Sequence, residues 1–362
     1  MSSGSEQTRP SDRAALGVGE IPVLVLNWNG FADTVECIDA LLKSTGVEFR
    51  VVLVDNGSAG DDFGRLQQRY GHDSRIEVRA NASNLGFARG MNKLFRELLA
   101  MGSERPGYVA LLNNDATPEP EWLGALASAA AESGAGALAS RMLRRDDESR
   151  LDNAGHMFMN TGEVLPRGAG HRPSEFSEPA DVAGACGGAC LLSLDMLDDI
   201  GIFDEFFDTG YEDAELGIRA MLAGYRQVYV PAAVVHHRIG ASIDKIRDRQ
   251  YAIRLQVNIN YTYLKLMPMA VMAWNAPWLL ARTLAMLLVP LLTLRWRLLS
   301  VQWAALVQTL RVGRQAWCER GKFDRRRLSA LEVVRRQHFF ARVYWGYFKR
   351  FVWRGERTIF ER

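Results

Sequence analysis

The sequence predicts an α/β fold, with a mostly parallel sheet flanked by helices and followed by a basic, apolar helical region. Short, dense apolar runs at 21–26 and 51–54 end in polar residues, as strands buried on both faces do. Between them, residues 34–42 carry helical spacing, and strand, helix, strand is the opening of a parallel sheet. The length of 362 residues leaves room for one large core and an appended module.

The same pattern repeats once along the chain. Residues 76–78 form a further apolar run, 87–99 have helical spacing, and 108–112 form another strand-like run. In an open sheet of this kind, ligands bind in the crevice at the carboxyl ends of the strands. Polar residues that follow the predicted strands are therefore the first candidates for a site.

The middle of the chain has a different texture. Residues 143–181 are rich in Gly, Pro, Arg and acids, which predicts a loop or a small antiparallel insertion running over the site. Regular secondary structure is predicted again after this segment, with a helix over 211–222 that ends at Gly224 and a short strand over 227–230.

Charge divides the chain into unequal halves. The first 244 residues hold 21 Lys/Arg against 36 Asp/Glu, and the remainder holds 23 against 6, so the net charges are −15 and +17. This asymmetry predicts an anionic partner for the second half. We divide the chain into a flexible, polar leader (1–20), an α/β domain that carries the candidate site (21–245) and a helical, Trp-rich module (246–362).

The four cysteines, Cys37, Cys186, Cys190 and Cys318, are too few and too scattered for a disulfide framework, which favours a reducing compartment. Cys186 and Cys190 are not followed by a second Cys/His pair with ligand spacing, so we do not predict a zinc site.

Residues 267–294 are nearly all apolar. Lys265 and Arg282 bracket the first part of this run, so no uncharged stretch reaches the length of a clean span. An arginine at the centre of a spanning helix costs about 3 kcal/mol. We therefore expect helices that lie in the membrane interface, at the cytoplasmic face; the alternative is a helical subdomain that covers its own apolar face. The side chains expected at headgroup depth are Trp274, Trp278, Trp296, Trp303, Arg295, Arg297 and Arg311.

Short acidic or amide-rich motifs follow the predicted strands. Asp55 opens Asp-Asn-Gly-Ser after the second strand, and its carboxylate can accept from a pyrimidine imide N–H; the alternative is an ordinary turn.

Asn113-Asn114-Asp115 ends the strand at 108–112. Oxygen ligands there suit Mg²⁺ or Mn²⁺ held partly by substrate phosphate, which would stabilise a departing diphosphate. The alternative is an N-cap for the helix near Glu121.

Glu212-Asp213 stands at the head of a predicted helix. Acids favour that position for the helix dipole alone, but a carboxylate there can also take the proton from an attacking hydroxyl. The segment before it, with Phe207, would supply an aromatic wall. His237 ends an apolar run and could complete a metal or phosphate site.

The ordered set of motifs resembles glycosyltransferase family 2, inverting enzymes of the GT-A fold, and most of all its rhamnosyltransferase-like bacterial branch. Together the matching stretches span residues 21–242, about two thirds of the chain. They are Val25-Leu26-Asn27-Trp28-Asn29-Gly30, Val54-Asp55-Asn56-Gly57-Ser58, Asn84-Leu85-Gly86-Phe87-Ala88-Arg89-Gly90-Met91-Asn92, Leu112-Asn113-Asn114-Asp115, 201–219 and 231–242.

The resemblance assigns roles to individual residues. It implies that Asp115 and His237 hold the metal or diphosphate and that Asp213 is the catalytic base. The family's metal motif usually reads Asp-x-Asp, whereas this chain has Asn113 first, which leaves Asp115 to carry most of the coordination. The acid after the base is Glu215 where the family usually has Asp. Residues implied to bind the donor nucleotide are Asn27, Asp55, Asn84, Gly86 and Asn114; those implied to line the acceptor side are Glu212, Trp28 and Phe207.

The sequence thus predicts transfer of a sugar, with rhamnose favoured by the resemblance, from a dTDP- or UDP-linked donor to a lipid-linked or surface-polysaccharide acceptor at an anionic membrane surface. A sugar nucleotidyltransferase is a second possibility, but the loop after Leu26 lacks the basic, Gly-rich character of that class. The third is a non-catalytic membrane or nucleic-acid binder. The tryptophans of the second half lie among long apolar runs, which favours lipid over nucleic acid.

Overall fold

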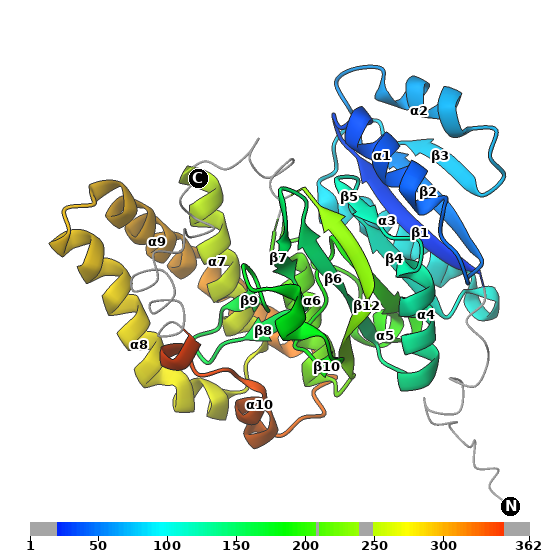
Figure 1. Ribbon diagram of the computed structural model, residues 1–362. Helices are drawn as coiled ribbons and strands as arrows, with labels where there is room; N and C mark the ends of the chain where they lie inside the picture. The colour runs from blue at the N-terminus through cyan, green and yellow to red at the C-terminus, as the bar shows by residue number, and fades with distance from the viewer. Residues whose placement is uncertain (1–19, 208–209, 239–248, 344–362) are drawn as a thin grey trace, which may run out of the picture.

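The computed structural model describes residues 20–207, 210–238 and 249–343, and within them it confirms the α/β class (Figure 1). Ten strands form one sheet in the order β10-β12-β6-β11-β4-β1-β2-β3, with β5 beside β12 and β7 beside β6. Strands β8 and β9 pair separately. The strands are β1 (Ile21–Asn27), β2 (Phe49–Asp55), β3 (Ile76–Ala80), β4 (Tyr108–Leu112), β5 (Ala116–Pro118), β6 (Ala137–Arg144), β7 (Asp147–Asn153), β8 (His156–Phe158), β9 (Val164–Pro166), β10 (Ala180–Asp181), β11 (Ala189–Ser193) and β12 (Gln227–His237).

The helices alternate with the strands in the first half of the chain and dominate its end. They are α1 (Phe31–Leu41), α2 (Asp62–Tyr70), α3 (Phe87–Ala100), α4 (Trp122–Ser133), α5 (Leu194–Ile200), α6 (Glu212–Leu222), α7 (Arg249–Leu266), α8 (Met269–Leu292), α9 (Trp296–Glu319) and α10 (Ala330–Arg336).

The parallel half of the sheet is the one predicted. Strands β4, β1, β2 and β3 are adjacent and parallel, and each lies where an apolar run was expected. Their carboxyl ends therefore share one edge, and the register pairs Asn27, the last residue of β1, with Asp55, the last of β2.

The other half is mixed rather than parallel. Strand β11 runs antiparallel between β4 and β6, while β12 runs parallel to β6. The short apolar run of β11 is compatible with either direction, because a strand buried on both faces reads the same way in parallel and antiparallel sheets. Only its two partners fix its direction.

Two apolar layers enclose the sheet. Side chains alternate between the faces of a strand, so Val23 and Val25 pack in one core cluster with α1, α2 and α4. Leu24 lies in the other cluster, with α3, α5 and α6. The run of apolar residues in β1 is thus explained by burial on both sides.

The predicted antiparallel insertion over 143–181 is present. It contains β7, the β8–β9 pair and β10, and β7 pairs antiparallel with β6. This insertion places the start of β8 beside the start of α6, since His156 Nε2 lies 3.8 Å from Asp213 Oδ2.

The C-terminal helices share the main core instead of standing apart. Leu266 of α7, Val271 of α8 and Val333 of α10 belong to the same buried cluster as Leu24 of the sheet. The predicted boundary at 245/246 lies outside the described residues, as does the predicted leader apart from Glu20.

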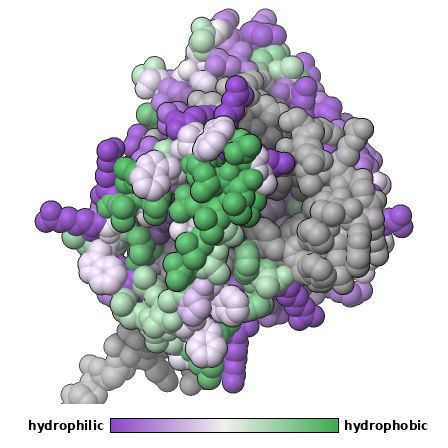
Figure 2. All heavy atoms as spheres, turned by 90° about the vertical axis from the view of Figure 1, so that its left-hand side faces the viewer, coloured by the Kyte–Doolittle hydropathy of each residue, from purple (hydrophilic) through white to green (hydrophobic). Residues whose placement is uncertain are grey.

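One described helix, α8, is long and apolar enough to cross a membrane, and 17% of its most apolar window is buried. Figure 2 shows apolar side chains gathered on the side of the molecule that carries α8 and α9. The Arg282 guanidinium is buried on the protein side of α8, where it binds Glu163 at 2.7 Å. The Arg282 charge therefore faces a carboxylate and not lipid, and the expectation that α8 lies in the membrane interface stays a prediction. The exposed large side chains of this surface include Trp274, Leu280, Leu284, Leu288, Leu292, Trp296 and Trp303.

Candidate functional site

The residues predicted to bind donor nucleotide follow β1, β2 and β4 at the shared carboxyl edge. The side-chain amide of Asn27 donates to Asp55 Oδ1 at 2.7 Å and to Asp62 Oδ2 at 3.0 Å. Ser58 donates to the same Asp55 carboxylate from its hydroxyl and its backbone N–H. Asp55 is thus the opening residue of a turn, the alternative considered from sequence, and its carboxylate is buried at the carboxyl edge of the sheet. Its contact with a pyrimidine stays a prediction.

The second loop of the edge is tied to the first through Asn56. Its amide nitrogen donates to Asn84 Oδ1 at 3.1 Å and to the Gly86 carbonyl at 3.2 Å. Gly57 has φ +72°, and a Cβ there would lie 2.4 Å from the carbonyl carbon of Ser83, so only glycine permits this approach. Asn84 and Gly86 therefore lie beside the Asp55 turn.

Thr34 connects β1 to the loop after β4. Its hydroxyl donates to Asn27 Oδ1 at 2.8 Å and accepts from the Asn114 amide at 2.9 Å. Asn114 thereby joins the group around Asp55. Sequence reasoning did not identify Thr34, because a buried threonine on a helix face has no distinguishing pattern.

His237 faces the carboxylate of Asp115. Register places His237 of β12 opposite Ala116 of β5, and His237 Nε2 lies 3.4 Å from Asp115 Oδ1. The other ring nitrogen, Nδ1, lies 2.8 Å from Asp152 Oδ2. Asp152 comes from β7 of the insertion and was missed, because nothing in its local sequence separates it from the neighbouring acids.

These charges favour a cation at this point. Burial opposes charging of the His237 ring, but the carboxylates of Asp115 and Asp152 outweigh it and raise the His237 pKa to about 10. Asp115 Oδ1 is buried and makes no hydrogen bond among the described residues. An unsatisfied carboxylate oxygen, an imidazole nitrogen and a carboxylate behind that imidazole form the usual arrangement around a bound divalent metal. The residues present fit such an ion.

Asp213 reaches the same edge through a glycine pair. The Gly187 N–H donates to Asp213 Oδ2 at 2.8 Å, and the next residue, Gly188, accepts from the Asn113 N–H at 2.8 Å. The predicted base is therefore two hydrogen-bonded steps from the Asn113-Asn114-Asp115 loop.

The start of α6 is fixed by Tyr211. Its φ is +86°, and its hydroxyl donates to the Gly162 carbonyl and accepts from the Val164 N–H. Such a backbone conformation in a non-glycine residue costs about 1–3 kcal/mol and persists only where surrounding contacts hold it. The hydrogen bonds of Tyr211 hold the first turn, with Asp213, against the β8–β9 pair.

Glu212 differs from its neighbour in environment. It is 8% exposed, and burial followed by the nearby Asp213 charge raises its pKa to about 8. Its Oε2 has no hydrogen-bond partner among the described residues. Glu212 is therefore protonated at neutral pH, whereas Asp213 accepts N–H bonds from Gly187 and Ala214.

The two aromatic residues predicted for the acceptor side have different places. Trp28 is partly exposed directly after β1. Phe207 is 1% exposed and packs against Phe206 and Tyr261. The expectation that Phe207 forms an open wall is wrong, because its ring fills the contact between the 201–207 segment and α7.

Glu215, noted as a departure from the family motif, is wholly buried. It accepts from Arg219 at 2.7 Å and from Lys265 of α7 at 2.9 Å. Arg219 also donates to three carbonyls at 200–202. This network attaches the helix that carries Asp213 to the C-terminal helices.

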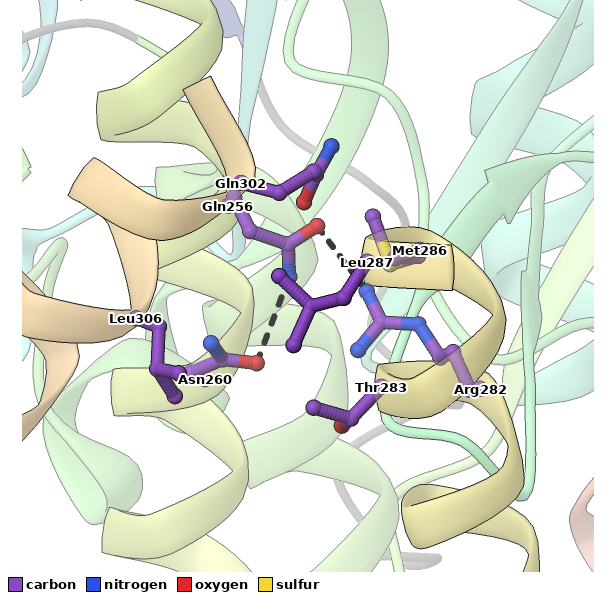
Figure 3. A pocket seen from close by; sticks show the side chains of 8 residues that line it. All are labelled: Gln256, Asn260, Arg282, Thr283, Met286, Leu287, Gln302 and Leu306. Carbon is purple, nitrogen blue, oxygen red and sulfur yellow. Dashed lines mark hydrogen bonds between the residues drawn. The ribbon is translucent and has the colours of Figure 1, made fainter. Parts of the chain in front are cut away.

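A separate pocket lies within the C-terminal helices. In Figure 3, Arg282 of α8 points toward Gln256 of α7, which accepts its guanidinium N–H at 3.0 Å. The same arginine binds Glu163, one residue from the Gly162 carbonyl that Tyr211 contacts. The pocket is lined by Gln256, Asn260, Arg282, Thr283, Met286, Leu287, Gln302 and Leu306.

Comparisons with known proteins agree with this geometry. The model of Glycosyl transferase family 2 matches residues 23–201. An N-acetylglucosaminyl-diphospho-decaprenol L-rhamnosyltransferase from Mycobacterium tuberculosis is 27% identical over 287 residues, which is 74% of this chain and 91% of that protein. The bifunctional glycosyltransferase pgtA of Dictyostelium discoideum is 29% identical over 96 residues, covering 26% of this chain and 12% of pgtA.

Solved structures share the fold. GalNAc-T7 with UDP, GalNAc and Mn²⁺ superposes with a TM-score of 0.53 at 13% identity, over 70% of this chain and 49% of that one. Staphylococcus aureus TarS 1-349 in complex with UDP-GlcNAc gives a TM-score of 0.52 at 16% identity, over 74% and 73% of the two chains. The architecture is therefore GT-A-like.

Proposed function

From the premise that this chain carries a glycosyl transferase family 2 domain over residues 23–201, we propose that it is an inverting glycosyltransferase that takes sugar from a nucleoside diphosphate. Its acceptor is a lipid-linked or surface-polysaccharide glycan at the cytoplasmic face of a membrane. One observation carries the proposal. Hydrogen bonds of Thr34 join Asn27, which holds Asp55, to Asn114 of the loop that carries Asp115. Hydrogen bonds of Gly188 and Gly187 join that loop to Asp213, and His237 Nε2 lies 3.4 Å from Asp115 Oδ1.

The donor base binds at the Asp55 turn. Asp55 is ionisable, buried and held by Asn27 and Ser58, so its position is fixed before ligand arrives. A fixed acceptor at the strand edge suits the imide N–H of thymine or uracil. Rhamnose is the favoured sugar, since a relative that aligns with this chain over 91% of the relative's length is named a rhamnosyltransferase.

Asp115 and His237 Nε2 would hold the cation, which is Mg²⁺ or Mn²⁺. When bound, it neutralises the negative charge of the diphosphate. Asp152 orients His237 through Nδ1 at 2.8 Å, which fixes the nitrogen presented to the ion. Asn113, standing where the family has an acid, keeps the negative charge that the protein itself supplies at this point low.

Asp213 acts as the base. The hydroxyl oxygen of the acceptor attacks the anomeric carbon, its proton passes to the Asp213 carboxylate, and the nucleoside diphosphate leaves from the opposite face, which inverts the configuration. Backbone N–H groups of Gly187 and Ala214 orient that carboxylate. Glu212, neutral at pH 7, adds no competing charge.

The C-terminal helices bring the enzyme to its acceptor. Residues 245–362 carry the net charge of +17, and α8 and α9 expose leucines and tryptophans on one surface. A basic, Trp-rich apolar surface binds anionic bilayers. We propose that residues 21–245 perform the chemistry and residues 246–362 hold that catalytic part at the membrane.

The test is a donor screen with the Asp213→Asn variant beside the wild type. dTDP- and UDP-linked sugars are supplied with Mg²⁺ or Mn²⁺, and product stereochemistry is read by NMR. We expect the variant to keep the wild-type circular dichroism and nucleotide affinity but to lose about 10²- to 10⁴-fold in kcat. Asp195→Asn, at an exposed ion pair with Arg105, is the control and keeps full activity. Undiminished transfer by Asp213→Asn would remove the proposed base.

A further inference from the structure

Two side chains from other parts of the chain converge on the proposed base, Asp213. His156 opens β8, Cys186 precedes β11, and Asp213 lies in the first turn of α6. One ligand atom from each lies within 4.8 Å of the other two. His156 Nε2 is 3.8 Å from Asp213 Oδ2.

We propose that His156, Cys186 and Asp213 form a second cation site, selective for a borderline-soft divalent ion such as Zn²⁺. The donor set is imidazole, thiolate and carboxylate, which Zn²⁺ binds in tetrahedral geometry. Mg²⁺ and Mn²⁺ favour oxygen ligands, so this site differs in selectivity from the Asp115–His237 pair.

The distances suit that geometry. Zinc-to-ligand bonds of about 2.0–2.3 Å place neighbouring ligand atoms about 3.3–3.7 Å apart. The His156–Asp213 pair, at 3.8 Å, meets this spacing almost without movement. The widest pair of the three closes by about 1 Å, which is within the range of one side-chain rotation at Cys186.

Backbone contacts hold the three ligands in one frame. The His156 N–H donates to the Gly184 carbonyl, and the Ala183 N–H donates to the His156 carbonyl, both at 2.9 Å. The Gly187 N–H then holds Asp213. The segment from 183 to 187 is thus tied to β8 on one side and to α6 on the other, and Cys186 lies between these attachments.

The three residues lie far apart in the sequence, so their spacing did not indicate a shared site. The pair that stands out in sequence is Cys186 with Cys190, but Cys190 is 1% exposed in the main core cluster. The partners of Cys186 are instead 30 residues before and 27 residues after it in the numbering, at 156 and 213. Cys190 therefore supplies a matched control on the same segment.

Occupation of the site has a consequence for transfer, and this part rests on the proposed role of Asp213. As the metal–sulfur bond forms, the Cys186 thiol releases its proton to solvent. The Asp213 carboxylate becomes a ligand and no longer accepts the proton of an attacking hydroxyl. Zn²⁺ is therefore an inhibitor that acts in the presence of saturating Mg²⁺.

The binding test uses Co²⁺ as a spectroscopic probe on the purified full-length protein, with a phosphine reductant. We expect a thiolate-to-cobalt charge-transfer band that Zn²⁺ abolishes. Cys186→Ser loses the band, and Cys190→Ser keeps it. His156→Gln is the second ligand variant and weakens Co²⁺ binding at least tenfold, so the test does not depend on one substitution.

The activity test measures Zn²⁺ inhibition of Mg²⁺-supported transfer, each variant relative to its own uninhibited rate. We expect Cys186→Ser to raise the half-inhibitory Zn²⁺ concentration at least tenfold and Cys190→Ser to leave it unchanged. Absence of the cobalt band in the wild type overturns the site and leaves the proposed function standing. A band with undiminished transfer at saturating Zn²⁺ supports the site and overturns the role given to Asp213.

Discussion

Replacing Glu215 with glutamine tests the attachment between the catalytic helix and the C-terminal helices. The Glu215 carboxylate is 0% exposed and neutralises two buried cations. Its Oε2 accepts from Arg219 and its Oε1 from Lys265, at 2.7 and 2.9 Å. An amide keeps the shape of the side chain and removes its charge, so both cations lose their common counter-ion.

The magnitude follows from what each cation retains. Breaking a buried pair by neutralising one partner costs about 3–5 kcal/mol. Lys265 keeps Asp204 at 2.6 Å, and Arg219 keeps the carbonyls of 200–202. The remaining acceptors place Glu215→Gln at the lower end, about 3 kcal/mol, which is a large share of a typical unfolding free energy of about 5–15 kcal/mol.

The assay is urea unfolding followed by circular dichroism, with the shift of the midpoint compared at equal slope. Glu77→Gln is the matched control. The Glu77 side chain is 57% exposed and pairs with Arg79 at the surface, so its loss changes the unfolding free energy by less than about 1 kcal/mol. If Glu215→Gln also falls within about 1 kcal/mol of the wild type, the buried network does not hold α6 to α7 and the reasoning is refuted.

Three further predictions concern the cation site, pH and the membrane. Asp152→Asn lowers Mn²⁺ affinity about 10- to 100-fold, because His237 loses the group that orients it. Calorimetric titration measures this affinity, and an unchanged value would show that Asp152 does not contribute to metal binding. The raised Glu212 pKa, about 8, means that the folded state holds a proton that the unfolded state releases near pH 4.5. Stability from this group is therefore present below pH 4.5 and is lost as pH rises through about 8. Glu212→Gln should flatten urea midpoints between pH 5 and 8, and a slope equal to that of the wild type would contradict the assignment. Leu288→Asp, on the exposed face of α8, weakens binding to anionic vesicles about a hundredfold, from a cost of about 3 kcal/mol per buried charge. Phe63→Asp, on α2, leaves sedimentation with vesicles unchanged, and equal loss in both variants would argue against a specific membrane surface.

Several features of the fold follow from local sequence. The apolar runs of β1, β2 and β4 each end where the sequence has a polar motif, because a strand buried on both faces must be apolar along its whole length. Parallel neighbours bring their carboxyl ends to one edge, so Asn27, Asp55 and the Asn113 loop meet there.

The C-terminal helices show what local pattern leaves out. Arg282 interrupts an apolar run, and the structure pairs it with Glu163, which is 119 positions away. The cost of a charge in a helix depends on whether a partner neutralises it. Sequence spacing within one helix carries no information about a partner on another element.

What the sequence by itself determined is the class of fold, the family and the order of the acidic stations, because these depend on periodicity and on contiguous motifs. The tertiary structure alone decided which side chains share a site. Asp152, behind His237, and His156, beside Cys186 and Asp213, come from an insertion whose strands find their partners only after the chain has folded. Long-range pairing is chosen by packing and hydrogen bonding between elements, and neither is written into the local order of residues.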